Sequence, residues 1–295
     1  MESQSRIVQQ SDGHPVPTSN RPESELVYRQ TRWTRLTHWV WALSLFFLLL
    51  SGLQIFNAHP ALYIGKQSGF QFDNDVLVIG SDYSSNGPIG YTELLGKRFN
   101  TTGILGLSGP IDNLDARAFP AWATIPSGQD LATGRVVHFF FAWALSATLL
   151  AWLVASALSG HLRRDLVPRA DDIRRLPRDI ADHARLKFHH SRDYNTLQKL
   201  AYGGVLFVLL PLMILTGLAM SPSMNAAIPF LADMLGGRQT ARTIHFVAMA
   251  LLVGFFIVHM LMILAAGPIN ELRSIITGWY RTDPSERGNS DKGSA

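Results

Sequence analysis

The sequence of 295 residues contains no cysteine. This absence excludes iron–sulfur clusters, covalently attached c-type haem, cysteine zinc sites and disulfides, because each of them needs a thiol or thiolate. Any redox centre in the chain is therefore a group held without a covalent bond by histidine or methionine, or a bound organic cofactor.

Charged residues are also scarce, at 16% of the chain against 47% apolar residues, a balance typical of an integral membrane protein. The net charge of +4 is small, and no basic patch with interleaved aromatic residues indicates a nucleic-acid partner. Four windows lack Asp, Glu, Lys and Arg, and each is long enough to cross about 30 Å of hydrocarbon. They predict membrane spans at 37–56, 136–160, 200–220 and 243–266.

The distribution of Lys and Arg between the connecting segments predicts the orientation of these spans. The segment 161–199 carries ten basic residues, whereas 57–135 carries five basic and seven acidic residues. We therefore expect 161–199 and both termini in the cytoplasm. The segments 57–135 and 221–242 would then lie in the periplasm, on the outer side of a bacterial inner membrane.

The two ends of the chain are expected to lie outside the membrane domain at 31–280. The first 30 residues are polar and lack the apolar core of a cleaved signal peptide. We interpret 1–30 as a disordered cytoplasmic tail, with the first span as an uncleaved anchor, and 281–295 as a second cytoplasmic tail. The predicted fold is an all-α integral membrane bundle of four transmembrane helices with a long periplasmic loop between the first and second.

That loop, 57–135, is too long for a simple connector. Runs such as Tyr83–Tyr91 and Thr101–Pro110 indicate turns and short irregular structure. We expect a lid over the mouth of the bundle, a docking site for a periplasmic partner, or both. Asp73 and Asp75 on either side of Asn74 resemble calcium ligands, but the rest of a calcium-loop pattern is missing.

The fourth span contains two histidines, His245 and His259. Fourteen residues of helix separate them by about 21 Å along the axis and leave them within roughly 40° of one face. Ionisable side chains inside a membrane are costly, and neutral imidazole is a common metal ligand, so the pattern favours two stacked haems. The alternative is a pair of structural histidines that hydrogen-bond across the bundle.

An Arg-x-x-His-aromatic signature begins three of the four spans. It occurs at Arg35 to Trp39, at Arg135 to Phe139 and at Arg242 to Phe246. Each arginine lies one helical turn nearer the water than its histidine, where it can pair with a haem propionate. Arginines and aromatic residues also gather at span ends for purely interfacial reasons, which is the alternative explanation.

The direction of each span then pairs the histidines by depth. His38 and His259 are expected near the inner face, and His138 and His245 near the outer face. The sequence thus predicts two non-covalent b haems with these four residues as iron ligands. His59 and His161 are competing candidates, but we interpret them as residues at helix ends.

The start of the third span carries two amides, Asn195 and Gln198, which share a helical face at about the depth of His259. Amides beside an inner haem are suited to hydrogen-bonding the carbonyls of a quinone. Helix capping and interhelical hydrogen bonds are an equally weighted alternative.

Together, the spacing of the four histidines and the run YNTLQK before the third span resemble the bacterial di-haem cytochrome b561 / Ni,Fe-hydrogenase cytochrome b group. The resemblance covers residues 30–280, and the runs SGLQIFNAHP and LTGLAMSP are similar to the branch of the thiosulfate reductase cytochrome b subunit.

The resemblance implies a quinone site near Asn195, Gln198 and His259 and electron transfer between the quinone pool and a periplasmic redox subunit. Such a partner would be like hydrogenase, formate dehydrogenase, thiosulfate reductase or a molybdenum-dependent sulfite oxidase. Quinone oxidation or reduction would be the only reaction on this chain.

Two other functions compete with this interpretation. A stand-alone quinol-linked reductase or oxidase would need no partner. A transporter with a histidine proton relay would be expected to have carboxylates in its spans and repeated whole spans, whereas the four windows contain no Asp or Glu.

Overall fold

The computed structural model describes residues 26–69, 71–85, 87–110, 113–160, 174, 176–177 and 196–282. Most of the segment 161–199, including His161 and Asn195, lies outside these residues, as do 1–25 and 283–295. Four helical runs in the described part are long and apolar enough to cross a membrane, and each contains one of the predicted spans. They are Arg32–Asn57, Leu131–Leu158, Thr196–Met220 and Arg238–Ala266.

The first, second and fourth runs are single helices, α1 (Arg32–Asn57), α2 (Leu131–Leu158) and α8 (Arg238–Ala266). The third run consists of α4 (Thr196–Gly204), a π-helical turn (Val205–Leu209) and α5 (Leu210–Met220). Proline has no N–H and clashes with the carbonyl four residues earlier, so Pro211 disturbs the regular pattern. The amide of Leu210 instead donates to the carbonyl of Val205, five residues back, as in a π-bulge.

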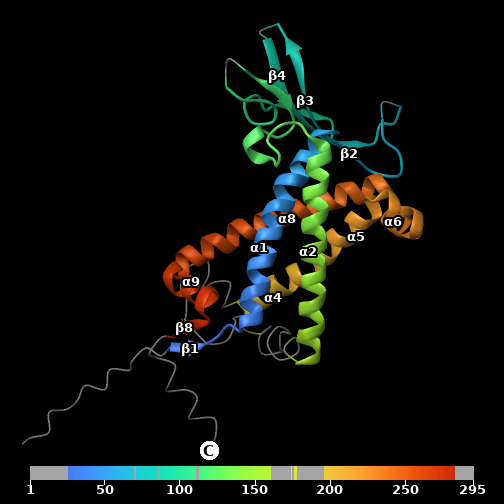
Figure 1. Cartoon of the computed structure of the whole chain (residues 1–295). Coiled ribbons are helices and arrows are strands. Elements are labelled where there is room, and N and C mark those ends of the chain that lie inside the picture. Colours follow the sequence, from blue (N-terminus) through green and yellow to red (C-terminus); the bar gives the residue numbers. More distant parts are fainter. Residues whose placement is uncertain are drawn as a thin grey trace, which may run out of the picture.

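The spans pack as two pairs, α1 against α2 and α5 against α8, and Figure 1 shows the two pairs crossing each other. One apolar cluster at mid-depth joins all four helices. Leu145 and Leu149 of α2 and Leu210 of α5 form its buried centre, and Leu45 of α1 and Leu252 of α8 pack against it. In α8, Leu252 lies between His245 and His259, so this apolar cluster separates the levels of its two histidines.

The connection between α1 and α2 forms antiparallel sheets. Four strands pair in the order β2 (Ala61–Tyr63), β3 (Asp75–Ser84), β4 (Gly87–Leu94) and β5 (Lys97–Asn100), and β6 (Gly106–Ser108) pairs with β7 (Asp115–Arg117). A short 3-10 helix, Ala121–Ala123, follows. In Figure 1 this unit sits at one end of the bundle, which we call the sheet end.

The prediction of irregular structure at Tyr83–Tyr91 was wrong, because this run is part of the β3–β4 hairpin, in which Ser84 pairs with Gly87. The hairpin signal was present in the sequence as the dipeptide Asn86-Gly87. The next hairpin turns at Leu95 and Gly96, which both have positive φ, as a tight two-residue turn between twisted strands requires. Tight turns thus connect strands in a segment whose glycines had suggested loops.

The sheets are fixed to the sheet end of the bundle by an apolar cluster and a buried arginine. Phe56 at the end of α1 packs with Leu62, Ile79 and Ala118, and Phe246 of α8 packs against them. This contact makes the connection a cover over the ends of α1 and α8, as expected of a lid.

The guanidinium of Arg117 hydrogen-bonds within this cover and to α1. Its Nε donates to the carbonyl of Phe119 and one Nη to that of Ser127, both at 2.7 Å, while the other Nη reaches Gln54 Oε1 of α1 at 3.2 Å. The side chain is only 2% exposed, so its burial depends on these partners.

At the opposite end, β1 (Leu26–Tyr28) pairs with β8 (Trp279–Arg281), and we call this the terminal end. Between α8 and β8 lies α9 (Pro268–Thr277), whose exposed apolar residues Ile269, Leu272 and Ile276 share one face. Two short helices, α6 (Pro222–Ala227) and α7 (Phe230–Met234), connect α5 to α8 at the sheet end.

Candidate functional site

His138 of α2 and His245 of α8 face each other near the sheet end. Their ring centroids are 6.5 Å apart, and the ring planes are inclined by 58°. An imidazole nitrogen binds a transition metal at about 2 Å, so two rings on opposite sides of one metal have centroids roughly 6 Å apart. The two rings are therefore too far apart to hydrogen-bond directly but well placed to share a metal ion.

A hydroxyl group on the neighbouring helix of each pair holds each of these histidines. Ser51 Oγ of α1 lies 3.1 Å from His138 Nδ1, and Thr216 Oγ1 of α5 lies 2.9 Å from His245 Nδ1. Each hydroxyl donates its only proton to the carbonyl four residues earlier in its own helix, at 2.5 Å for Phe47 and 2.6 Å for Leu212. When the hydroxyl proton occupies this short hydrogen bond, the hydroxyl oxygen accepts from Nδ1–H, and in that tautomer Nε2 of each histidine is unprotonated and able to bind a metal.

A glycine follows each hydroxyl residue and makes room beside the ring. A Cβ atom on Gly52 would lie 3.3 Å from Cε1 of His138, and one on Gly217 would lie 3.6 Å from Cε1 of His245. The same four-residue pattern, Leu-Ser/Thr-Gly-Leu, occurs at 50–53 and at 215–218. The pattern is visible in the sequence, but only the three-dimensional structure shows that each copy contacts a histidine.

The other two predicted ligands, His38 of α1 and His259 of α8, lie toward the terminal end and are close enough to interact electrostatically. His38 Nδ1 is buried, and the described part of the chain offers it no hydrogen-bond partner. His259 stacks on Phe255 with centroids 5.7 Å apart, and Tyr202 meets its edge at 6.5 Å. This pair is thus lined by aromatic rings where the sheet-end pair is lined by hydroxyls.

The three signature arginines occupy different surroundings. Arg35 Nη1 donates to the carbonyl of Ile276 in α9 at 2.7 Å, and its buried Nε has no partner within the described ranges. Arg242 donates to the carbonyl of His59 and lies over the ring of Phe56. Arg135 is exposed near Phe139. Within the residues that the structure describes, none of the three arginines pairs with a carboxylate, so their charges are available to an anionic ligand.

The remaining candidates are placed as follows. Gln198 is half-buried in the first turn of α4, toward the terminal end, whereas Asn195 lies outside the described residues. His59 follows the C-cap of α1 and stacks on Tyr63 at 5.7 Å, as expected of a residue at a helix end. Partial burial, and then the charge of Arg242, lower the pKa of His59.

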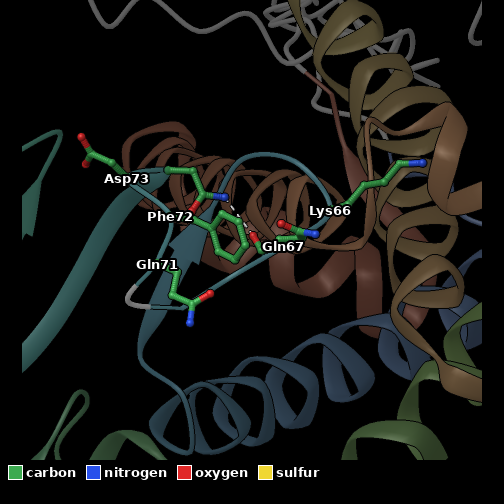
Figure 2. Close-up of a pocket in the computed structure, with 6 residues that line it drawn as sticks. Lys66, Gln67, Gln71, Phe72 and Asp73 are labelled. Carbon is green, nitrogen blue, oxygen red and sulfur yellow. Dashed lines mark hydrogen bonds between the residues drawn. The ribbon is translucent and has the colours of Figure 1, made fainter.

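The suspected calcium ligands lie in the connection between β2 and β3 and at the start of β3. Figure 2 shows the hollow in the β2–β3 connection with Asp73 pointing away from it. Asn74 uses its amide as a donor, to the carbonyls of Ile64 and Gln67, both at 2.8 Å. No cluster of three or more potential metal-ligating His, Asp or Glu side chains occurs among the residues that are described.

The same connection anchors the start of α8. The carbonyl of Gly65 accepts hydrogen bonds from the amides of Gln239 and Thr240 in the first turn, and Lys66 forms a 2.7 Å ion pair with Asp233 of α7. These contacts satisfy amides that a helix N-terminus leaves free, and they fix the end of the helix that carries His245.

A family model described as prokaryotic cytochrome b561 matches residues 29–278. The chain belongs to the prokaryotic cytochrome b561 family. This cytochrome is also 26% identical over 235 residues, which is 78% of its own length and 87% of the relative, to a protein of Azospira oryzae named as a protein-methionine-sulfoxide reductase subunit, YedZ1. The family and the four spans establish a multi-pass membrane cytochrome b with a role in electron transfer, and proteins of this family bind haem b.

The sheet-end site of the cytochrome fits a haem on three observations. Its donor set is a pair of imidazoles, their separation suits a shared iron, and Gly52 leaves room beside His138, where a Cβ would lie 3.3 Å from Cε1. At the terminal end, Nδ1 of His38 and Nε of Arg35 are buried polar atoms without a partner among the described residues, and an anionic metal cofactor would satisfy the guanidinium.

Proposed function

We propose that this cytochrome holds two haem b groups and carries electrons through the membrane from one to the other. His138 and His245 would ligate the sheet-end iron, and His38 and His259 the terminal-end iron. The observation that carries the proposal is the 6.5 Å separation of the His138 and His245 rings, each with Nδ1 tied to a hydroxyl.

The haems supply one-electron redox chemistry, and the protein supplies ligands, orientation and a low-dielectric surrounding. The apolar cluster around Leu145, Leu149 and Leu210 excludes water between the two levels. Arg135 and Arg242 are available to propionates at the sheet end, and Arg35 to those at the terminal end. The arginines would thus balance the anionic edges of the haems at the membrane surface.

The sheet end would face the periplasm, in agreement with the few basic residues of 57–135 and the many of 161–199. A periplasmic redox subunit would dock on the sheet unit and exchange electrons with the sheet-end haem. The name of the Azospira relative, a reductase subunit, supports a partner of this kind. The resemblance noted above allows a hydrogenase-, formate dehydrogenase-, thiosulfate reductase- or sulfite oxidase-like enzyme, which includes molybdenum-cofactor enzymes.

Quinone would react at the terminal end. Gln198 and His259 both lie toward this end, and Tyr202 next to His259 adds an aromatic surface for the quinone ring. Asn195, three residues before Gln198, is the second amide expected to bind a quinone carbonyl. The cytochrome would thus join the quinone pool on one side of the membrane to the partner on the other.

The first test is a dithionite-reduced minus oxidised spectrum of the purified full chain, with pyridine-haemochrome quantification of haem per polypeptide. We expect two low-spin b haems with two histidine ligands each. Chains without haem would overturn the proposal. Quinol turnover by the chain alone, with a soluble electron acceptor and no partner, would instead favour the stand-alone reductase.

A further inference from the structure

Ser51 and Thr216 hold the two sheet-end histidines in the same way, although they belong to different helix pairs. In both cases the hydroxyl oxygen lies close to Nδ1, at 3.1 and 2.9 Å. In both cases the hydroxyl also lies near the carbonyl three residues earlier in its own helix, at 3.4 Å for Leu48 and 3.1 Å for Met213. Two unrelated stretches of helix thus present the same acceptor group to the back of each ring.

These hydroxyls are unusually good acceptors because their protons are already engaged. Ser51 donates to Phe47 at 2.5 Å and Thr216 to Leu212 at 2.6 Å. Hydrogen bonds in a chain polarise one another, so a hydroxyl that donates to a carbonyl accepts more strongly. A strong acceptor at Nδ1–H makes Nε2 of the same ring a more basic ligand.

A more basic pair of axial ligands stabilises ferric iron over ferrous iron and so lowers the reduction potential of a haem. At the terminal end, Nδ1 of His38 has no hydrogen-bond partner within the described part of the chain.

We propose that Ser51 and Thr216 are positioning residues that fix the tautomer of His138 and His245 and lower the reduction potential of the sheet-end haem. This inference rests on the proposed two-haem function. In this inference, two hydroxyl groups that do not contact the iron set the reduction potential of the sheet-end haem. The potential of the terminal-end haem is not affected by them.

The test is a potentiometric titration of the purified full chain carrying Ser51→Ala and Thr216→Val, followed by absorbance and by electron paramagnetic resonance. The titration is repeated in a His38→Ala background, in which only the sheet-end haem is retained. Ser51→Thr and Thr216→Ser keep the hydroxyls and serve as rescue variants. Ser146→Ala is the matched control, since Ser146 also donates to the carbonyl four residues earlier, at 2.7 Å to Ala142, in α2.

We expect the double variant to favour reduction of the sheet-end haem by about tenfold, which for a one-electron couple is an upward shift of about 59 mV. The terminal-end component, the rescue variants and Ser146→Ala should keep the wild-type potentials. If the double variant loses the sheet-end haem, the single variants, which each keep one hydroxyl, should each show about half the shift.

Three results would overturn the inference while leaving two haems in place: no shift in either component, an equal shift in both, or an equal shift with Ser146→Ala. A wild-type chain with fewer than two haems would instead overturn the proposed function itself, and the haem quantification distinguishes that failure from the others.

Discussion

The two histidine pairs of this cytochrome share α8 but lie in different surroundings. At the sheet end, Nδ1 of His138 and of His245 is hydrogen-bonded to a hydroxyl group. At the terminal end, His38 and His259 have aromatic neighbours, Trp39 and Phe255, with ring centroids 5.5 and 5.7 Å away. The sheet-end pair is thus fixed by directed polar contacts and the terminal-end pair by packing.

The segments outside the spans also differ between the two ends of the bundle. Packed side chains and the buried Arg117 fasten the sheet unit to the ends of α1 and α8. At the terminal end, α9 and the β1–β8 pair lie beside the bundle, with Arg35 connecting α1 to α9.

The sharpest way to separate the two sites is to remove one ligand from each. His245→Ala should abolish the sheet-end haem and leave the other, so that haem per chain falls from two to one. His259→Ala should do the converse, and the two variants should differ in which potential survives. Pyridine-haemochrome quantification and redox titration measure both effects, with His59→Ala as the control that keeps both haems. Two haems at full occupancy in His245→Ala would show that the pairing is wrong.

The space beside the sheet-end pair can be filled without substituting either proposed ligand. Gly52→Leu should sharply lower occupancy of the sheet-end haem, because even a Cβ there would lie 3.3 Å from His138.

The matched control is Gly254→Leu in α8, where a Cβ would meet no atom within 4 Å among the described residues. Haem content and the absorbance of each potentiometric component provide the measurement. Equal losses in the two variants would mean that Gly52 serves general helix packing and not the haem.

The rigidity of the sheet-end cover can be reduced selectively. Arg117→Ala removes a buried guanidinium and leaves Gln54 and two carbonyls without their donor. Each buried group left unsatisfied costs about 1–3 kcal/mol, so we expect the cover to loosen markedly.

Hydrogen exchange should then increase in β2 to β7 but not in the membrane helices. Arg98→Ala, which removes a largely exposed ion pair with Asp82 at 3.1 Å, should change exchange much less. Uniform exchange changes throughout the bundle would contradict a separable cover.

The smallest expected effect concerns the start of α2. Asp130 caps this helix, and the hydrogen bonds from Thr133 hold the pKa of its carboxyl below the usual value. A depressed carboxyl pKa contributes stability above the unfolded value, about pH 4, and this stability is lost as the pH falls through the folded value. Asp130→Asn keeps a capping side chain but cannot titrate, so its unfolding temperature should decline less steeply with acid. Identical acid profiles would exclude a role for this carboxyl.

Much of the membrane domain could be predicted from the sequence. The four spans, the depth order of the four histidines and the cytochrome b561 resemblance needed only the length of apolar runs and the helical repeat, and the spans and the family are confirmed. The roles of the three signature arginines, the two haems and the quinone site at Gln198 and Asn195 stay predictions.

The sheet unit and the hydroxyl partners were not predicted. The strands were missed because their glycines were interpreted as loop signals, although Leu95-Gly96 and the Asn-Gly dipeptide mark tight hairpins. Arg117 was counted as one loop charge, since nothing adjacent to it in the sequence indicates burial against Gln54 of α1. The first error misread a local turn signal, whereas the second arose because the role of Arg117 depends on a distant segment.

The sequence by itself predicted four membrane spans and the order of the histidines along them, because hydrophobic length and the 3.6-residue repeat are local properties. Only the tertiary structure decided what those histidines contact. Ser51 and His138 are 87 residues apart, Thr216 and His245 are 29 apart, and Gln54 and Arg117 are 63 apart. Contacts over such separations depend on how the two helix pairs cross and how the cover folds, which no local pattern specifies.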